Sequence, residues 1–168
     1  MSNFSILERR MDVSVQQFVE RMALLCEKEG MPRIGGRIFG YLLVTDEPFS
    51  LDELAERLQA SKASVSTNAR MLEQFGMVKR VSQMGDRRDF YRVEDDPWEK
   101  MLRVAQGRWR DMTQVFAEAA QRLPHPDGRR RMEEAERFHD LLIRECDKLI
   151  ESWHALLDRD AAAEQPAA

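Results

Sequence analysis

The stretch at 60–93 reads ASKASVSTNARMLEQFGMVKRVSQMGDRRDFYRV and decides the fold. Ser61 suits the N-cap of a helix, because its side-chain oxygen can accept a backbone N–H that has no partner within the helix. Gly76 suits the left-handed residue at which such a helix ends. The apolar residues between them recur at spacings of four and three, which is the period of one helical face: Val65, Ala69 and Leu72. We therefore predict a helix over about 61–75.

A basic hairpin follows this helix. Two short runs rich in branched and aromatic residues, 77–81 and 90–93, predict two strands. The link at 83–88 reads QMGDRR, which is polar and basic, and Gly85 suits its turn. The stretch at 60–93 holds seven basic and three acidic residues, a net charge of +4, whereas the whole chain carries −4. Phosphate binding requires a local basic footprint and does not require a basic protein.

The residues before Ser61 complete a helix-turn-helix pattern. Ser50 and Glu53 have the spacing of a capping box, in which each side chain binds the backbone N–H of the other. A short helix over 51–58 follows, and only Gln59-Ala60 link it to Ser61. Two short helices joined by so brief a turn indicate a helix-turn-helix, and the hairpin after them makes it a winged helix. An ordinary helix and hairpin with a solvated basic face is the alternative.

The rest of the chain is helical by the spacing of its apolar residues. We expect helices over 12–29, 33–44, 97–123 and 129–159. Residues 45–48 form a turn, and the PHPDG sequence at 124–128 is the clearest break. The last helix carries apolar residues at alternating spacings of three and four, a heptad seam: Met132, Ala135, His139, Leu142, Cys146, Leu149, Trp153 and Leu156. Residues 1–10 are expected to form a frayed arm, and residues 161–168 a disordered tail.

Composition and motifs exclude several classes of protein. The longest run without a charge, Ile38–Thr45, has eight residues, which is too short for a membrane span. Met1–Arg10 does not have the pattern of a signal peptide, so we expect a cytoplasmic protein. We find no nucleophile elbow, phosphate loop or paired-histidine motif, and therefore predict neither an enzyme nor a cofactor. The spacings among His139, Cys146 and His154 match no common zinc site.

The helices expected over 12–29 and 129–159 carry more apolar surface than one winged-helix domain can cover. We therefore predict a homodimer. The fold class that we expect is mainly α with a small β-hairpin wing, a winged helix-turn-helix plus a helical dimerisation extension. Two symmetric reading helices would enter successive major grooves about 34 Å apart, so the operator should be close to palindromic. The expected domains are an N-terminal arm and helix at 1–30, a DNA-binding domain at 31–95, a helical dimerisation and ligand region at 96–160, and the tail at 161–168.

The order SLDELAERLQASKASVSTNARMLEQFGMVKRV at 50–81, with GDRRDFYRV at 85–93, resembles the winged-helix domain of MarR-type transcriptional regulators. The earlier GMPRIGGRIFGYLLV at 30–44 is similar to the GbsR-like branch of that family. The resemblance covers about residues 12–98. It implies a sequence-specific DNA-binding transcriptional regulator, namely a dimeric repressor that responds to a small ligand.

The candidate DNA-binding residues divide by chemistry. The start of the 61–75 helix favours phosphate through its dipole and N–H groups, and the residues there are Ser61, Lys62 and Ser64. Candidates for base edges or nearby phosphate in the major groove are Ser66, Thr67, Asn68 and Arg70. Arg87 or Arg88 of the wing, 83–89, could enter a narrow minor groove. The family resemblance implies that Asp86 orients Arg88; the alternative is a turn residue that binds its own backbone.

Regulation leaves more alternatives open. GbsR-like regulators are linked to choline and glycine betaine metabolism, and a quaternary ammonium effector would need an aromatic cage. The rings that could supply one are Tyr41, Trp98, Trp109, Phe116 and Trp153, and packing in the core or the dimer is the alternative role. A thiol switch at Cys26 or Cys146 would need exposure and a basic neighbour, whereas their apolar stripes favour packing. A winged helix that binds protein instead of DNA is the remaining alternative.

Overall fold

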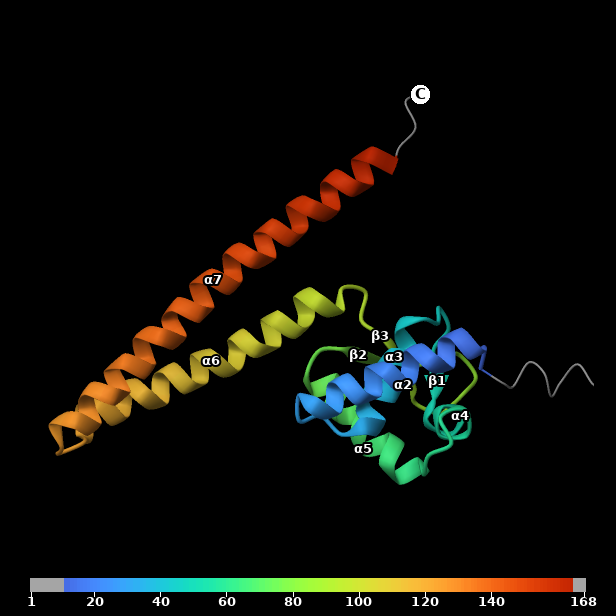
Figure 1. Cartoon of the computed structure of the whole chain (residues 1–168), viewed down its shortest axis with the longest axis horizontal. Coiled ribbons are helices and arrows are strands. Elements are labelled where there is room, and N and C mark those ends of the chain that lie inside the picture. The colour runs from blue at the N-terminus through green and yellow to red at the C-terminus, as the bar shows by residue number, and fades with distance from the viewer. Residues whose placement is uncertain (1–10, 165–168) are drawn as a thin grey trace, which may run out of the picture. The chain divides into compact units, whose positions relative to one another are not determined.

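The computed structural model describes residues 11–164 of the chain. It divides after Pro97 into two compact units, each of which is described by itself. The expected frayed arm at 1–10 lies outside the described residues. Figure 1 shows the elements in chain order, coloured from blue to red.

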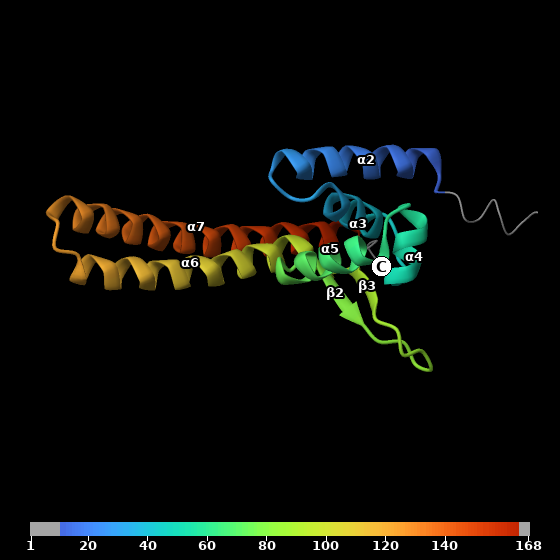
Figure 2. The same ribbon diagram turned by 90° about the horizontal axis from the view of Figure 1, so that it is seen from below.

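Unit 1 contains a bundle of short helices and a small sheet. Its elements are α2 (Val13–Lys28), α3 (Arg33–Leu43), β1 (Phe49–Ser50), α4 (Leu51–Arg57), α5 (Lys62–Gln74), β2 (Val78–Val81) and β3 (Phe90–Val93). One hydrophobic core joins all of these helices to the sheet, and it is built around Val19, Ile38, Leu42, Leu54, Val65 and Leu72. Figure 2 shows α2 on one side of the unit and the β2–β3 hairpin extending from the other. The prediction of a mainly α fold with a small wing is confirmed.

The sheet has one strand more than the sequence predicts. β2 and β3 pair antiparallel from Val78 opposite Val93 to Val81 opposite Phe90. β1 adds to the other edge of β3, with Phe49 opposite Tyr91, so the strand order is β1-β3-β2. A strand of two residues is too short to show an alternating pattern, which is why the sequence indicates only a turn in this region. Through β1 the wing is tied directly to the start of α4.

Glycine allows α2 and α3 to pack closely. A Cβ atom added at Gly36 would lie 2.7 Å from the Cα of Ala23 and 2.9 Å from the Cβ of Cys26. Ala23 itself is completely buried. The glycine therefore lowers the intrinsic helix propensity of α3 in exchange for close contact between two backbones.

Unit 2 is a helical hairpin of α6 (Pro97–Arg122) and α7 (Pro126–Glu164). Helix α7 extends beyond the expected 129–159, so the prediction of a disordered tail is wrong for 161–164, while 165–168 lie outside the described residues. Within the described helices, none is both long and apolar enough to cross a bilayer.

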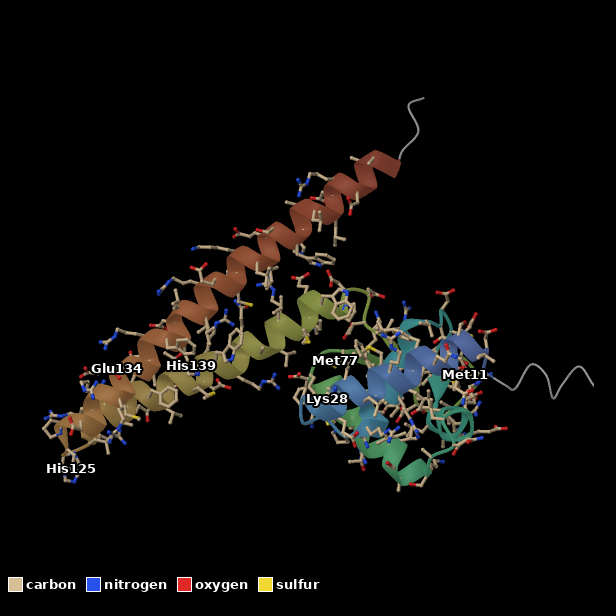
Figure 3. All side chains as sticks on the ribbon, viewed as in Figure 1. Met11, Lys28, Met77, His125, Glu134 and His139 are labelled. Atoms are coloured by element: carbon tan, nitrogen blue, oxygen red, sulfur yellow. The ribbon has the colours of Figure 1, made fainter. Side chains whose placement is uncertain are left out.

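A buried amide joins the two helices of unit 2. The side chain of Gln106 on α6 is completely buried, and its Nε2 donates to the carbonyl of Ile143 at 3.0 Å and to Oδ1 of Asp147 at 2.8 Å. Nearer the hairpin turn, the ring of Phe116 lies 5.1 Å from that of His139, which Figure 3 labels on α7. Both contacts span the pair of helices, so they fix which residues of α7 face α6.

The heptad seam expected on α7 is only partly buried. Cys146 is buried, but Leu149 is 55% exposed, and Ile150 takes the buried place beside it. Seven residues of a straight helix fall about 20° short of two full turns, so a heptad pattern drifts away from one partner. An apolar face remains open on α7: Phe138, Leu141, Leu149 and Leu156.

Replacing Gly36 with alanine tests the close packing of α2 on α3. Alanine raises helix propensity by about 1 kcal/mol, but its methyl group would overlap buried backbone, and overpacking costs about 1–3 kcal/mol. We expect a net loss of stability, measured as a lower midpoint of urea unfolding. The control is Gly107→Ala in α6, where an added Cβ meets nothing within 4 Å. Equal or higher stability of Gly36→Ala would contradict the proposed close packing.

Candidate nucleic-acid interface

The turn between α4 and α5 is set by local hydrogen bonds. Ser50 Oγ accepts from the backbone N–H of Glu53 at 3.3 Å, and Glu53 Oε2 accepts from the backbone N–H of Ser50 at 2.8 Å, so the predicted capping box is confirmed. The hydrogen bonds from Ser50 lower the pKa of the Glu53 carboxyl. After α4, Gln59 adopts a left-handed φ of 50°, a conformation that usually favours glycine. The sequence held no indication of this, because glutamine seldom occupies such a position.

Helix α5 begins where its sequence predicts, and its apolar stripe faces the core. Ser61 Oγ accepts from the backbone N–H of Ser64 at 3.2 Å, which confirms the N-cap, and Gly76 takes a positive φ of 72° just after the helix. The stripe that faces the core is fully buried: Val65, Ala69 and Leu72. Of the predicted contact residues, Ser61, Lys62, Thr67 and Arg70 are exposed, and Ser64 and Ser66 are half-buried.

Contrary to the expectation from the sequence, Asn68 does not lie on the outer face of α5, and its buried amide is poorly placed to reach a base edge or a nearby phosphate. Its side chain is 6% exposed, and its Nδ2 donates to the carbonyl of Ser64 at 2.9 Å. Its Oδ1 has no partner in the described part of the chain and would lie 3.2 Å from a Cβ added at Gly35 of α3. The spacing explains this placement: Asn68 stands three residues after Val65 and four before Leu72, on the buried stripe itself.

Most of the basic residues at 60–93 are already paired with carboxylates. Lys62 Nζ lies 2.8 Å from Asp52, Arg80 lies 3.3 Å from Asp89, and Lys79 and Arg92 both pair with Asp95. Arg70 donates only to the carbonyl of Ser66, at 3.3 Å. Among the described residues, neither Arg70 nor Arg87 lies within ion-pair distance of a carboxylate. These two arginines, one on α5 and one on the wing, are therefore the most readily available cations of the surface.

The wing loop is folded around Asp86 and Arg88. The carboxylate of Asp86 accepts from the backbone N–H of Arg88 at 2.9 Å and from its guanidinium at 2.6 Å, and these hydrogen bonds hold the pKa of Asp86 below its usual value. The guanidinium also lies 5.1 Å from the centre of the Phe90 ring, and its Nη1 donates to Ser50 Oγ at 3.4 Å. Arg88 thus connects the wing to the cap of α4, and Asp86 is both a turn residue and its ion-pair partner.

The five aromatic residues considered for a cage are divided between the two units. Tyr41 is buried in unit 1, where its ring faces Phe49, and the guanidinium of Arg57 already lies over both rings. Phe116 packs on His139 in unit 2. The remaining three rings all belong to unit 2: Trp98, Trp109 and Trp153. A cavity of about 610 Å³ between α2, α3 and α4 is lined by Arg37, Arg57 and Gln59 among others, and by none of the five rings.

The two cysteines do not have the environment of a reactive thiol. Burial raises the pKa of the Cys26 thiol, and burial together with the neighbouring Asp147 raises that of Cys146. A redox-sensing cysteine needs a lowered pKa and exposure. Cys146 is buried and Cys26 is half-buried, so neither thiol has the exposure that a redox switch needs.

Comparison with known proteins places the chain among transcriptional regulators. The MarR family matches residues 41–90, which run from α3 to the start of β3. The HTH-type transcriptional regulator MmpR5 of Mycobacterium tuberculosis is 38% identical over 132 residues, 76% of this chain and 78% of that protein. The HTH-type transcriptional repressor GbsR of Bacillus subtilis is 30% identical over 112 residues, 67% of this chain and 59% of that protein.

A solved structure extends the similarity beyond the winged helix. A crystal structure of a transcriptional regulator, 30% identical, superposes with a TM-score of 0.79 over 84% of this chain and 99% of the other. The relatives are regulators and not enzymes, as the absence of catalytic motifs led us to expect. The helix-turn-helix of α4 and α5, the N-cap of α5 and the ion-paired wing loop are consistent with these similarities. The chain belongs to the MarR family of DNA-binding transcriptional regulators.

Proposed function

We propose that this protein is a dimeric repressor that inserts α5 into the major groove of a near-palindromic operator and lays the β2–β3 loop against the minor groove. The observation that carries the proposal is the division of α5 into two faces. Its apolar stripe is fully buried, while Lys62, Thr67 and Arg70 stay exposed on a helix whose N-terminus is capped by a serine. Exposed side chains of this kind can donate to phosphate and to base edges.

Roles on α5 follow from exposure and available charge. Ser61, Lys62 and Ser64 lie at the positive end of the helix dipole, where phosphate is favoured. Lys62 would exchange its exposed ion pair with Asp52 for a phosphate, because such surface pairs contribute only about 0–1 kcal/mol. Thr67 and Arg70 face outward and are the proposed base or phosphate contacts, with half-buried Ser66 beside them.

Dimerisation is supported by apolar residues left open on the long helix of unit 2. Phe138, Leu141, Leu149 and Leu156 are each between 41% and 57% exposed, and their spacings of three, eight and seven place them on one side of α7. A second copy of the chain would cover this side. A small ligand would then regulate the repressor by changing the distance between the two α5 helices.

Arg70→Ala tests the major-groove contact. The probe is a duplex selected by the wild-type protein from a random-sequence pool, and affinity is measured by fluorescence anisotropy over a range of salt concentrations. If Arg70 binds a phosphate, the slope of log affinity against log salt falls by about 1 for each Arg70 that contacts the duplex. If it reads a base, affinity falls for the selected duplex more than for mixed sequence. Arg21→Ala is the control, since Arg21 is exposed on α2, outside the proposed surface; equal effects would contradict the proposed role.

Asp86→Ala tests whether the Asp86–Arg88 ion pair is needed to hold the wing loop for DNA binding. Coulomb attraction alone predicts tighter binding when a carboxylate near phosphate is removed. We expect several-fold weaker binding, because Arg88 loses the partner that folds the loop. Asp89→Ala is the matched control: it also removes one wing carboxylate, but the partner of that carboxylate is Arg80 at 3.3 Å. Asp89→Ala should bind DNA as tightly as the wild type or more tightly. If both variants bound more tightly to the same extent, the proposed role of the Asp86–Arg88 ion pair would be refuted.

Leu149→Asp tests the dimer. Sedimentation equilibrium of the wild type should give twice the chain mass of 19.6 kDa. A carboxylate on the open side of α7 should shift the mass toward the monomer, because burying an unpaired charge is costly. Arg144→Asp places the same side chain on another, already exposed side of the helix and should leave the dimer intact. A wild-type monomer would overturn the dimeric repressor.

A further inference from the structure

The wing ends in a methionine that no other part of the unit covers. The loop between β2 and β3 closes with a hydrogen bond from the backbone N–H of Asp86 to the carbonyl of Gln83, at 3.2 Å. Gly85 within it has a φ of +84°, as the third residue of a type II turn requires. Met84 precedes this glycine at the apex and is 105% exposed, so its side chain is entirely in solvent. Figure 2 shows the hairpin extending away from the helices of unit 1.

The position of this methionine differs from that of the others in unit 1. Five methionines there pack against the hydrophobic core: Met11, Met22, Met31, Met71 and Met77. Met84 does not join them. The Asp86–Arg88 ion pair, at 2.6 Å, and the contact of Arg88 with the Phe90 ring fold the part of the loop that follows it. The same contacts commit Arg88 to the base of the wing, so Arg87 is the loop cation without a carboxylate partner among the described residues.

An apolar tip beside an available cation is complementary to the minor groove. The floor of that groove is formed by base edges and its walls by sugars, and both edges carry phosphates. Proteins that bind there use arginine together with apolar side chains, methionine included. The thioether side chain is flexible and polarisable, so it can fit a narrow and irregular groove.

We propose that Met84 enters the minor groove and packs on its sugars and base edges, while Arg87 contacts a flanking phosphate and Arg88 holds the fold of the loop through Asp86. This inference rests on the proposed binding of duplex DNA. It adds a sequence preference. The 2-amino group of guanine projects into the minor groove, where an apolar side chain cannot accept its hydrogen bond, so an apolar tip favours A·T pairs where the wing lies.

The first test compares Met84→Ala and Met84→Leu on the selected duplex, at several salt concentrations. Met84→Ala should weaken binding by about fivefold for each wing engaged, through loss of apolar burial alone. Its salt slope should equal that of the wild type, because no charge is removed, whereas Arg87→Ala should lower the slope by about 1 for each phosphate released. Met84→Leu should restore most of the affinity. Unchanged affinity of Met84→Ala, or a changed slope, would overturn the apolar contact.

The second test identifies the groove. Replacing guanine by inosine at the outer positions of the duplex removes the 2-amino group from the minor groove and leaves the major-groove acceptors in place. The wild type should bind the inosine duplex more tightly than the parent, and Met84→Ala should lose most of that gain. An equal gain for both proteins would place Met84 outside the minor groove and refute the proposal.

The outcomes separate this inference from the function on which it rests. If the wild type binds no duplex at any salt concentration, the proposed function fails. If the wild type binds with the expected salt dependence and Met84→Ala behaves identically on both duplexes, only the role of the apex fails. In that case the exposed methionine would be an ordinary isolated apolar residue of the surface.

Discussion

Burial of one stripe of α5 is the constraint on which the rest of the binding surface depends. Val65, Ala69 and Leu72 are completely buried against the core of unit 1. Burial of a large apolar side chain stabilises a fold by about 1.5–3 kcal/mol, so rotating α5 by one residue would forfeit much of the stability of the domain. The same packing that holds the helix therefore decides that Thr67 and Arg70 face outward and that Asn68 faces inward.

The structure also changes what the charge of this region means. The net charge of +4 at 60–93 suggests a broad basic patch, but most of its cations already pair with carboxylates, several of which, such as Asp52 and Asp95, lie outside the stretch. Exposed pairs of this kind are weak and can be exchanged for phosphate. The acidic neighbours thus keep the surface close to neutral, and in the proposed complex Arg70 and Arg87 would meet the duplex without first giving up an ion pair.

Local features are predictable from the sequence, and features that depend on distant residues are not. The caps at Ser50 and Ser61 and the turn at Gly76 follow from residues within four positions, and all three are confirmed. The strand β1 depends on pairing with β3, some forty residues later, and the roles of Arg88 and Tyr41 depend on Ser50, Phe49 and Arg57. Asn68 is the exception among local features, because its spacing indicates burial whereas its polarity suggests an outward position.

The buried amide of Gln106 has a consequence for how unit 2 can move. Its Nε2 group is bound to two acceptors on α7, and its Oε1 has no partner in the described part of the chain. If α7 slid by one turn along α6, this buried amide would lose both acceptors, which is unfavourable. The two helices can twist or bend together, but lengthwise slippage is resisted at this point. A displacement of the turn between α6 and α7 would therefore move the two helices together.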